Sequence, residues 1–348
     1  MTKRLISIGV LSQWEQNGTY YTIKQILSNC GYEYIYGNPT LSILTNEHDF
    51  ILIFHLTKKT AEKIKGLNLC LDVIVDTGMN QVDYCNPSIK SLVKNSKYFI
   101  MNIDEKDSVS ILDDDIESLI ITYGLNNKAT VTASSLTFGS NIKFNICLQR
   151  KCTTVKGNII EPMEFPITID LIGRCNFYNS LAAITFGLIY GIPIEKINDA
   201  LLNIKETVSC LEKIHHKDNI IILDNCYKDD YNFVFEEIQY IKYNSIYVML
   251  SIDKYQEFYK IKSNLKVIFD WHPVVNIKKL FLYVEGNNGL IRRNIESLFF
   301  NQKLDYSLFS NLEKCIHLST QLLKNGDILL ILGKDSMKDI RKILCQLL

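Results

Sequence analysis

The apolar positions in the first 125 residues come in short runs that end in Gly, Asp or Asn. Five such runs cover residues 4–10, 49–56, 71–78, 97–104 and 118–124. Amphipathic stretches separate them, among them "YYTIKQILSNCG", which we expect to be a helix that ends at Gly31. Continuous apolar runs that alternate with helices are typical of a parallel sheet covered on both faces.

From residue 127 to 171 the helical pattern disappears. The segments "KATVTASSLTF", "NIKFNICLQR", "KCTTVKGNI" and "MEFPITIDL" are rich in β-forming residues and are joined by Gly or Asn turns. They predict antiparallel strands added to the first sheet. Two helices are predicted next, over 176–190 and 194–205, the second beginning near Pro193.

The strand-and-helix alternation restarts after residue 206. Apolar runs at 219–225, 245–252, 265–271, 279–285 and 326–333 are predicted strands with helices between them. The pattern therefore predicts an α/β chain of two domains. Residues 1–206 would carry a mostly parallel sheet with a small antiparallel one, and residues 207–348 would form a Rossmann-like domain.

Composition narrows the class of protein. Of the 348 residues, 47% are hydrophobic and 22% are charged, which fits a globular chain with room for two cores. Lys plus Arg and Asp plus Glu both number 38, so no excess of basic residues points to a nucleic-acid partner. No apolar run is long enough for a transmembrane helix, and we expect no membrane partner. The ten cysteines include no C-x-x-C pair, which predicts reduced thiols in a cytoplasmic protein.

One helix begins with unexpected polarity. In "LIGRCNFYNSLAAITFGLIY", Asn176 and Asn179 stand three residues apart at the head of an otherwise apolar, Ala-rich helix. Carboxamides at this position can cap the first turn, and they can also contact a ligand. The residues alone leave both interpretations open.

This stretch resembles the G-x-F-N-x-Y-N-x-L-A-A run of the Mur ligase family, most closely of its muramyl-tripeptide synthetase branch. The matching residues are Gly173, Asn176, Tyr178, Asn179, Leu181, Ala182 and Ala183, with Cys175 in place of the aromatic residue. Four further segments resemble family motifs in the same order: "NIDEKDS", "IITYGLNNKATVTASS", "ILDNCYKDDYNFVFEEI" and "NGDILLILGKDSMKD". The resemblance covers roughly residues 5–340.

The resemblance implies a chemistry and a set of site residues. Family members join a carboxylate to an amino group with ATP and magnesium, through an acyl-phosphate and a tetrahedral intermediate. The domain that grips the UDP end of the substrate in most cell-wall members is not expected here. The residues implied to contact nucleotide are Asn17, Gly18, Asn102, Asn176 and Asn179. The implied catalytic residues are Asp224 and Lys94, the latter as the carbamylated lysine with Lys90 and Lys97 as alternatives, and Asn287 and Asn288 are implied to bind substrate.

The chain departs from the family pattern where ATP and metal would be held. The family's phosphate-binding loop reads G-T-N-G-K-T-T. In this chain Thr19 stands where the loop has its lysine, and Tyr20 stands where the loop has its metal-binding hydroxyl. Asn80 and Gln81 replace an Asp-His pair, and the segment "LIFHLTKK" lacks the expected magnesium glutamate. Ser209 and Cys210 replace the linker arginine, and Tyr227 replaces a histidine. No residue is predicted to bind a metal ion.

Losing one preorganised electrostatic group typically costs about 2.7–4 kcal/mol of transition-state stabilisation. Several such groups are replaced here, so we expect a degenerate family member with little or no ligase activity. Such a protein would act as the partner or regulatory subunit of an active ligase paralogue. The alternative is an active ATP-dependent ligase that adds an amino acid to a cell-wall precursor or polyamide. A third hypothesis is a binder of another ligand where the strand ends converge.

Overall fold

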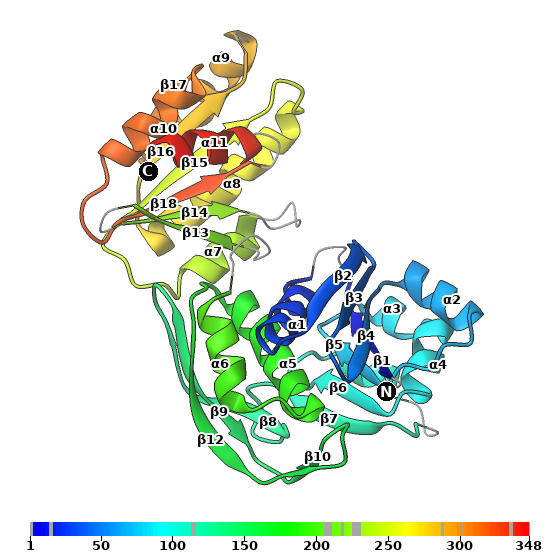
Figure 1. The fold of residues 1–348 in the computed structure, drawn as a ribbon. Helices are drawn as coiled ribbons and strands as arrows, with labels where there is room; N and C mark the ends of the chain where they lie inside the picture. Colours follow the sequence, from blue (N-terminus) through cyan, green and yellow to red (C-terminus); the bar gives the residue numbers. More distant parts are fainter. Residues whose placement is uncertain are drawn as a thin grey trace. The chain divides into compact units, whose positions relative to one another are not determined.

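The computed structural model describes residues 3–13, 17–112, 116–204, 211–216, 219–224, 231–286, 289–300, 302–333 and 337–347. The chain forms two compact units (Figure 1). The first comprises Met1–Thr137, Asn141–Asp170 and Arg174–Val208, and the second comprises Phe138–Ser140, Leu171–Gly173 and Ser209–Leu348.

Within the described residues, the first unit is built on a ten-stranded sheet of order β12-β9-β8-β7-β6-β5-β1-β4-β3-β2. The strands are β1 (Arg4–Leu11), β2 (Glu33–Asn38), β3 (Leu41–Thr45), β4 (Asp49–Leu56), β5 (Val73–Asp76), β6 (Tyr98–Asn102), β7 (Leu119–Tyr123), β8 (Val131–Phe138), β9 (Ile142–Leu148) and β12 (Met163–Ile169). Strands β4, β1, β5, β6 and β7 are parallel, and β12 is antiparallel to β9. The predicted parallel sheet with antiparallel additions is confirmed. A separate two-stranded sheet pairs β10 (Cys152–Thr153) with β11 (Ile159–Ile160).

Helices cover both faces of this sheet (Figure 1). On one face α1 (Gly18–Asn29), α5 (Arg174–Tyr190) and α6 (Ile194–Leu202) pack against one another. On the other lie α2 (Lys58–Gly66), α3 (Gln81–Tyr84), α4 (Pro87–Lys94) and the short 3-10 helix η1 (Ser108–Ile111). Helix α5 is buried on every side from Ser180 to Tyr190, which explains its apolar sequence.

The second unit carries a six-stranded sheet of order β13-β14-β18-β15-β16-β17 in the described part of the chain. Its strands are β13 (Leu211–His216), β14 (Asn219–Asp224), β15 (Ile246–Ile252), β16 (Ile277–Val284), β17 (Tyr306–Phe309) and β18 (Ile328–Leu332). All are parallel to their neighbours except β13, which is antiparallel to β14. The helices are α7 (Tyr231–Ile238), α8 (Phe258–Val275), α9 (Gly289–Leu298), α10 (Leu312–Gln321) and α11 (Met337–Leu347).

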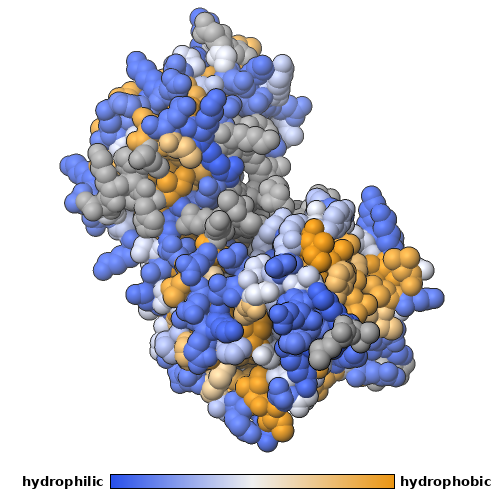
Figure 2. All heavy atoms as spheres, in the orientation of Figure 1, coloured by the Kyte–Doolittle hydropathy of each residue, from blue (hydrophilic) through white to orange (hydrophobic). Residues whose placement is uncertain are grey.

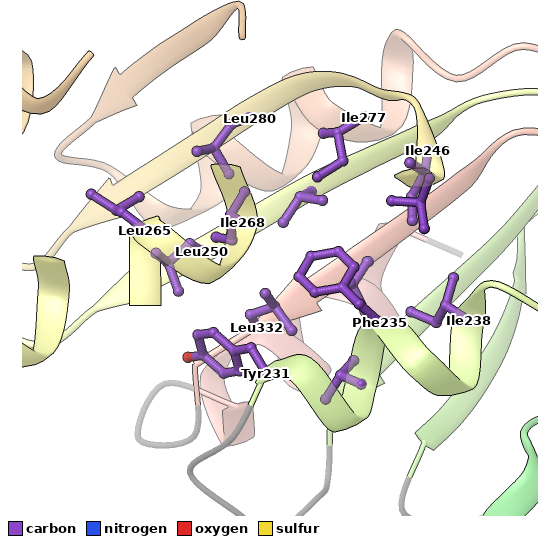
Figure 3. Close-up of a cluster of buried hydrophobic side chains, with 14 of the residues drawn as sticks. Tyr231, Phe235, Ile238, Ile246, Leu250, Leu265, Ile268, Ile277, Leu280 and Leu332 are labelled. Carbon is purple, nitrogen blue, oxygen red and sulfur yellow. The ribbon is translucent and has the colours of Figure 1, made fainter. Parts of the chain in front are cut away.

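Two apolar layers hold the helices of the second unit on its sheet. Figure 3 shows side chains from α7 and α8, among them Phe235 and Leu265, packing against β15, β16 and β18. The other layer joins α10 and α11 to the opposite side of the same strands, through residues such as Ile316 and Leu344. Every residue of β15 is buried, and its apolar side chains alternate between the two layers, as a strand covered on both faces requires.

One predicted strand is wrong, and three strand regions were not predicted. Residues 265–271 lie inside helix α8, because Ile261, Leu265 and Ile268 are buried at helical spacing while Lys262 and Lys266 are exposed. A short apolar run fits a buried helix as well as a strand, so the run alone cannot decide. The additional elements are the hairpin β2–β3 and the edge strands β13 and β17.

Hydrophilic residues cover most of the visible face of both units (Figure 2). No helix in the ranges that the structure describes is both long enough and apolar enough to cross a bilayer.

Candidate functional site

The candidate site lies at the carboxyl edge of the first sheet. Strand β1 is flanked there by β4 and β5. Its chain continues into α1 on one face, whereas the chain after β5 continues into α3 and α4 on the other. In open α/β sheets, ligands bind where neighbouring connections diverge in this way.

Asn17 joins the start of α1 to the end of β5. Its side-chain Oδ1 accepts hydrogen bonds from the backbone N–H groups of Thr19 (2.8 Å) and Tyr20 (3.2 Å), and so caps the helix. Its Nδ2 donates to Thr77 Oγ1 at 2.6 Å, and that hydroxyl donates to the Leu11 carbonyl at 2.7 Å. Two of the amides at this helix start are therefore already bonded within the chain.

Gly18 and Thr19 lie against Asn179 of α5. A methyl group added at Gly18 would lie 2.3 Å from Asn179 Nδ2, so glycine permits the close approach of the two helices. The Thr19 hydroxyl donates to the Asn179 side-chain Oδ1 at 3.1 Å and to its carbonyl at 3.3 Å. Thr19 is fully buried by these contacts. The structure thus brings together Asn17, Gly18 and Asn179, three of the residues predicted to contact nucleotide.

Tyr20 points away from the helix start. Its hydroxyl donates to Ser42 Oγ of β3 at 2.7 Å, and burial raises the pKa of Tyr20 to about 12. Lys24, one turn further, lies over the rings of Tyr20, Tyr21 and Tyr34, with its Nζ 4.6 Å from the Tyr34 ring centroid. Desolvation lowers the pKa of Lys24. The cation nearest in sequence to the helix start is therefore engaged with tyrosines of α1 and β2.

Asn102 and Asp104 organise the end of β6. Asn102 is buried and its Oδ1 accepts from the Asp104 N–H at 3.1 Å. The Asp104 carboxylate accepts from the N–H groups of Leu125 and Asn126 in the loop after β7, and from the Tyr178 hydroxyl at 2.8 Å. The segments "NIDEKDS", "TYGL" and "RCNFYN", far apart in sequence, therefore meet at one carboxylate.

Asp76, at the end of β5, was not predicted as a site residue. It is fully buried, and its Oδ1 accepts from the Tyr84 hydroxyl (2.7 Å) and the Gly78 N–H (3.1 Å). The Tyr123 hydroxyl donates to the Asp76 carbonyl at 2.7 Å. Burial raises the pKa of Asp76 to about 6, against the lowering effect of the hydrogen bond from Tyr84. The "D-T-G" at the strand end was the available signal, since acids there face the carboxyl edge.

The remaining predicted residues lie elsewhere. Asn176 is buried in the first turn of α5, between Gly173 and Tyr178 in sequence. Lys94 ends α4, just before the start of β6, and so lies toward the amino edge of the sheet. The structure does not bring it to Asn17 or Asn102, and the alternative Lys97 forms an ion pair with Asp72 at 2.7 Å.

In the second unit, Asp224 ends β14, and its side chain is outside the described part of the chain. Asn287 and Asn288 also lie outside the described residues. Glu212, which follows the expected linker arginine, is bonded to Arg341 of α11 at 2.7 Å. Among the residues described, no group of three or more His, Cys, Asp and Glu side chains is arranged to hold a metal ion.

Comparison with solved structures identifies the fold. The chain aligns over 99% of its length with 79% of a solved UDP-N-acetylmuramoyl-L-alanyl-D-glutamate–2,6-diaminopimelate ligase, with a TM-score of 0.73 and 14% sequence identity. It aligns over its whole length with 79% of a pseudomurein peptide ligase type C from Methanothermus fervidus, with a TM-score of 0.62 and 16% identity. At these identities the likeness shows a shared fold.

Sequence comparison identifies the family. The family described as Mur ligase middle domain matches residues 78–187. The chain is 32% identical over 143 residues to UDP-N-acetylmuramoyl-L-alanyl-D-glutamate–2,6-diaminopimelate ligase 1 of Clostridium acetobutylicum, and 36% identical over 139 residues to UDP-N-acetylmuramate–L-alanine ligase of Vesicomyosocius okutanii. Each match covers 40% of this chain and 27% of the relative. Residues 78–187 thus carry the Mur ligase middle domain, and the matched segment spans about a quarter of these relatives.

Proposed function

We propose that this chain is a Mur ligase scaffold with little or no ligase activity, which acts as a partner or regulatory subunit of an active ligase. The proposal depends chiefly on one observation, the hydrogen bonds from the Thr19 and Tyr20 amides to the Asn17 side chain. A helix start holds phosphate through such amides, and here they are bonded within the chain.

The side chains at the same place support the proposal. The resemblance assigns a phosphate-binding lysine to position 19 and a metal-binding hydroxyl to position 20. Thr19 instead bonds Asn179, and the Tyr20 hydroxyl bonds Ser42. Lys24 is held over three tyrosine rings. The described residues at this helix start thus do not fit a triphosphate and its magnesium ion.

The names of the relatives suggest a context for the partner. The matched proteins are ligases that add L-alanine or 2,6-diaminopimelate to UDP-N-acetylmuramoyl compounds. We infer that the active partner is a ligase of this kind, acting on a cell-wall precursor. The alternative is that the chain itself is an ATP-dependent ligase for such a precursor or a polyamide. The intact cluster of Asn102, Asp104 and Tyr178 favours that alternative.

ADP release separates the two functions. The purified chain is incubated with Mg-ATP, UDP-N-acetylmuramoyl peptides and a panel of amino acids, alone and together with an active diaminopimelate ligase from the same host. We expect no amino-acid-dependent ADP release from the chain alone, and a changed rate when it is added to the active ligase. Amino-acid-dependent ADP release by the chain alone would establish the alternative function.

A further inference from the structure

The second unit includes two short segments that interrupt the chain of the first unit. They are Phe138–Ser140, at the turn between β8 and β9, and Leu171–Gly173, between β12 and α5. The strands and the helix on either side of them belong to the first unit. Each segment therefore packs with one unit while both of its ends are joined covalently to elements of the other.

Ile172 anchors the second of these segments. Its side chain is 1% exposed and belongs to the apolar core of the second unit, together with residues of β13, α7 and β15 such as Leu211, Phe235 and Val248. An isoleucine in a close-packed core is held in place, because moving it out would leave a cavity. The core of the second unit therefore fixes the chain at a point just before α5.

The turn Phe138–Ser140 is held in the second unit by other contacts. The Lys213 ammonium group, on a side chain that is almost fully buried, donates to the Ser140 carbonyl at 2.7 Å. The Phe138 ring centroid lies 5.9 Å from that of Tyr240. Hydrogen bonds from a buried ammonium group are costly to break. Both segments are therefore firmly attached to the second unit.

The connection from Ile172 to α5 is short. Only Gly173 separates Ile172 from Arg174, the first residue of α5. Two residues span at most about 7 Å, so the start of α5 cannot move far from the position of Ile172. Gly173 has φ of +87°, in the left-handed region that favours glycine, and so bends the chain sharply into the helix.

The start of α5 carries contacts that organise the candidate site of the first unit. The Tyr178 hydroxyl donates to Asp104 at 2.8 Å, and the same carboxylate holds two amides of the loop after β7. The Asn179 side chain accepts from the Thr19 hydroxyl at 3.1 Å. Because hydrogen bonds weaken steeply as their geometry is distorted, a shift of the α5 start would loosen all of these contacts.

We propose that Leu171–Gly173 is a structural link through which the core of the second unit sets the position of the α5 start. The hydrogen bonds that Tyr178 and Asn179 make in the first unit then depend on the packing of Ile172 in the second. A protein or small molecule that shifts this packing would change the candidate site of the first unit. The link consists of packing and one short covalent connection, so the inference goes beyond the proposed scaffold role and does not depend on it.

Hydrogen–deuterium exchange of the full-length chain, resolved to single amides, tests the link. The reporter amides are those of Thr19, Leu125 and Asn126, which are hydrogen-bonded at the candidate site. Ile172→Ala removes the anchor, and the reporter amides should then exchange at least about 10-fold faster, because local opening becomes more frequent. Ile268→Ala removes the same atoms from helix α8 of the same core, and should change the reporter amides by less than about twofold.

Exchange of the amides in β15, at the centre of the second sheet, shows whether the second unit is still folded in each variant. If Ile172→Ala fails to fold, the comparison is made with Ile172→Val and Ile268→Val. Each of these removes one methyl group, so the same difference between the two positions is expected at smaller size.

A pair of glycine variants tests the link without changing the core. Gly173→Ala forces an alanine into the left-handed region, and should speed exchange of the reporter amides while β15 stays protected. Gly191→Ala is the matched control, because Gly191 has φ of +88° and follows the other end of α5. It should leave the reporter amides unchanged.

The proposal is wrong if Ile172→Ala or Gly173→Ala leaves the reporter amides as they are in the native protein. It is also wrong if either control variant speeds their exchange as much as its partner does. Neither result bears on ADP release, so failure of the link and failure of the proposed function are distinguishable.

Discussion

At the residue scale, Asp76 combines complete burial with an ionisable group at a strand end. Two contacts hold its Oδ1, and Glu105 adds a repulsive negative charge nearby. Because desolvation disfavours the charged carboxylate, the folded protein binds the proton more tightly than the unfolded chain does. Ionised Asp76 therefore destabilises the fold, and the cost grows as pH rises.

Replacing Asp76 by asparagine should remove this cost. The pKa rises from an ordinary value of 3.8 to about 6 in the folded chain. Stability of the native protein should therefore fall as pH rises from about 4 and should level off above about 7, a total loss of about 3 kcal/mol. The difference in free energy of unfolding between Asp76→Asn and the native protein, measured by urea unfolding, should therefore shift by about 3 kcal/mol in favour of the variant between these pH values.

Asp270→Asn is the control for this experiment. Asp270 is an exposed residue on α8 of the second unit, so its replacement should leave the pH dependence of unfolding as in the native protein. Parallel stability curves for Asp76→Asn and the native protein across this pH range would show that Asp76 ionises in the fold without penalty.

At the element scale, the contact between α1 and α5 closes the start of α1. Gly18 allows the helices to approach, and Thr19 bonds Asn179 across the contact. The same two helices pack together along their length on one face of the sheet. The geometry of the helix start thus depends on side chains 160 positions apart in sequence.

Gly18→Ala should strain this contact. The added methyl group would lie 2.3 Å from Asn179 Nδ2, and overpacking of this kind typically costs about 1–3 kcal/mol. Thermal or urea unfolding measures the loss. Gly66→Ala, at the end of α2 with no atom within 4 Å of the added methyl group, should be neutral or slightly stabilising.

A double variant identifies the cause. Asn179→Ala removes the clashing amide, so Gly18→Ala should cost less in that background than in the native protein. An equal cost in both backgrounds would mean that the methyl group meets something other than Asn179.

The elements of the parallel sheets were predictable because buried parallel strands are continuous apolar runs. Strands β1, β4, β5, β6 and β7 follow this rule, as do β15 and β18. The rule fails for residues 265–271, where apolar positions serve one face of α8. It also misses β2, whose Tyr34, Ile35 and Tyr36 are exposed on a sheet edge.

The site was predictable as a set of candidates, and its geometry was not. The motifs named Asn17, Gly18, Asn102 and Asn179, and three of these meet at the start of α1. The sequence does not single out Asp76, because the tyrosines that contact it, Tyr84 and Tyr123, belong to other segments.

At the scale of the whole molecule, the two units differ at the carboxyl edges of their sheets. In the first, the amides of Thr19 and Tyr20 are bonded to Asn17, and Gly18 lies against Asn179. In the second, the corresponding edge opens into a cavity of about 680 Å³, whose walls include Ser251, Glu285 and Gly333. We therefore propose a Mur ligase fold whose first unit has lost the phosphate-binding function at the start of α1.

Titration of the purified chain with Mg-ATP tests the central claim most directly. Nucleotide at about 100 times its Kd would stabilise the fold by about 2.7 kcal/mol, so calorimetry and thermal melting report the same event. The account predicts no saturable heat and no rise in Tm at millimolar Mg-ATP. A saturable, magnesium-dependent isotherm with a matching rise in Tm, lost in Gly18→Ala, would contradict it.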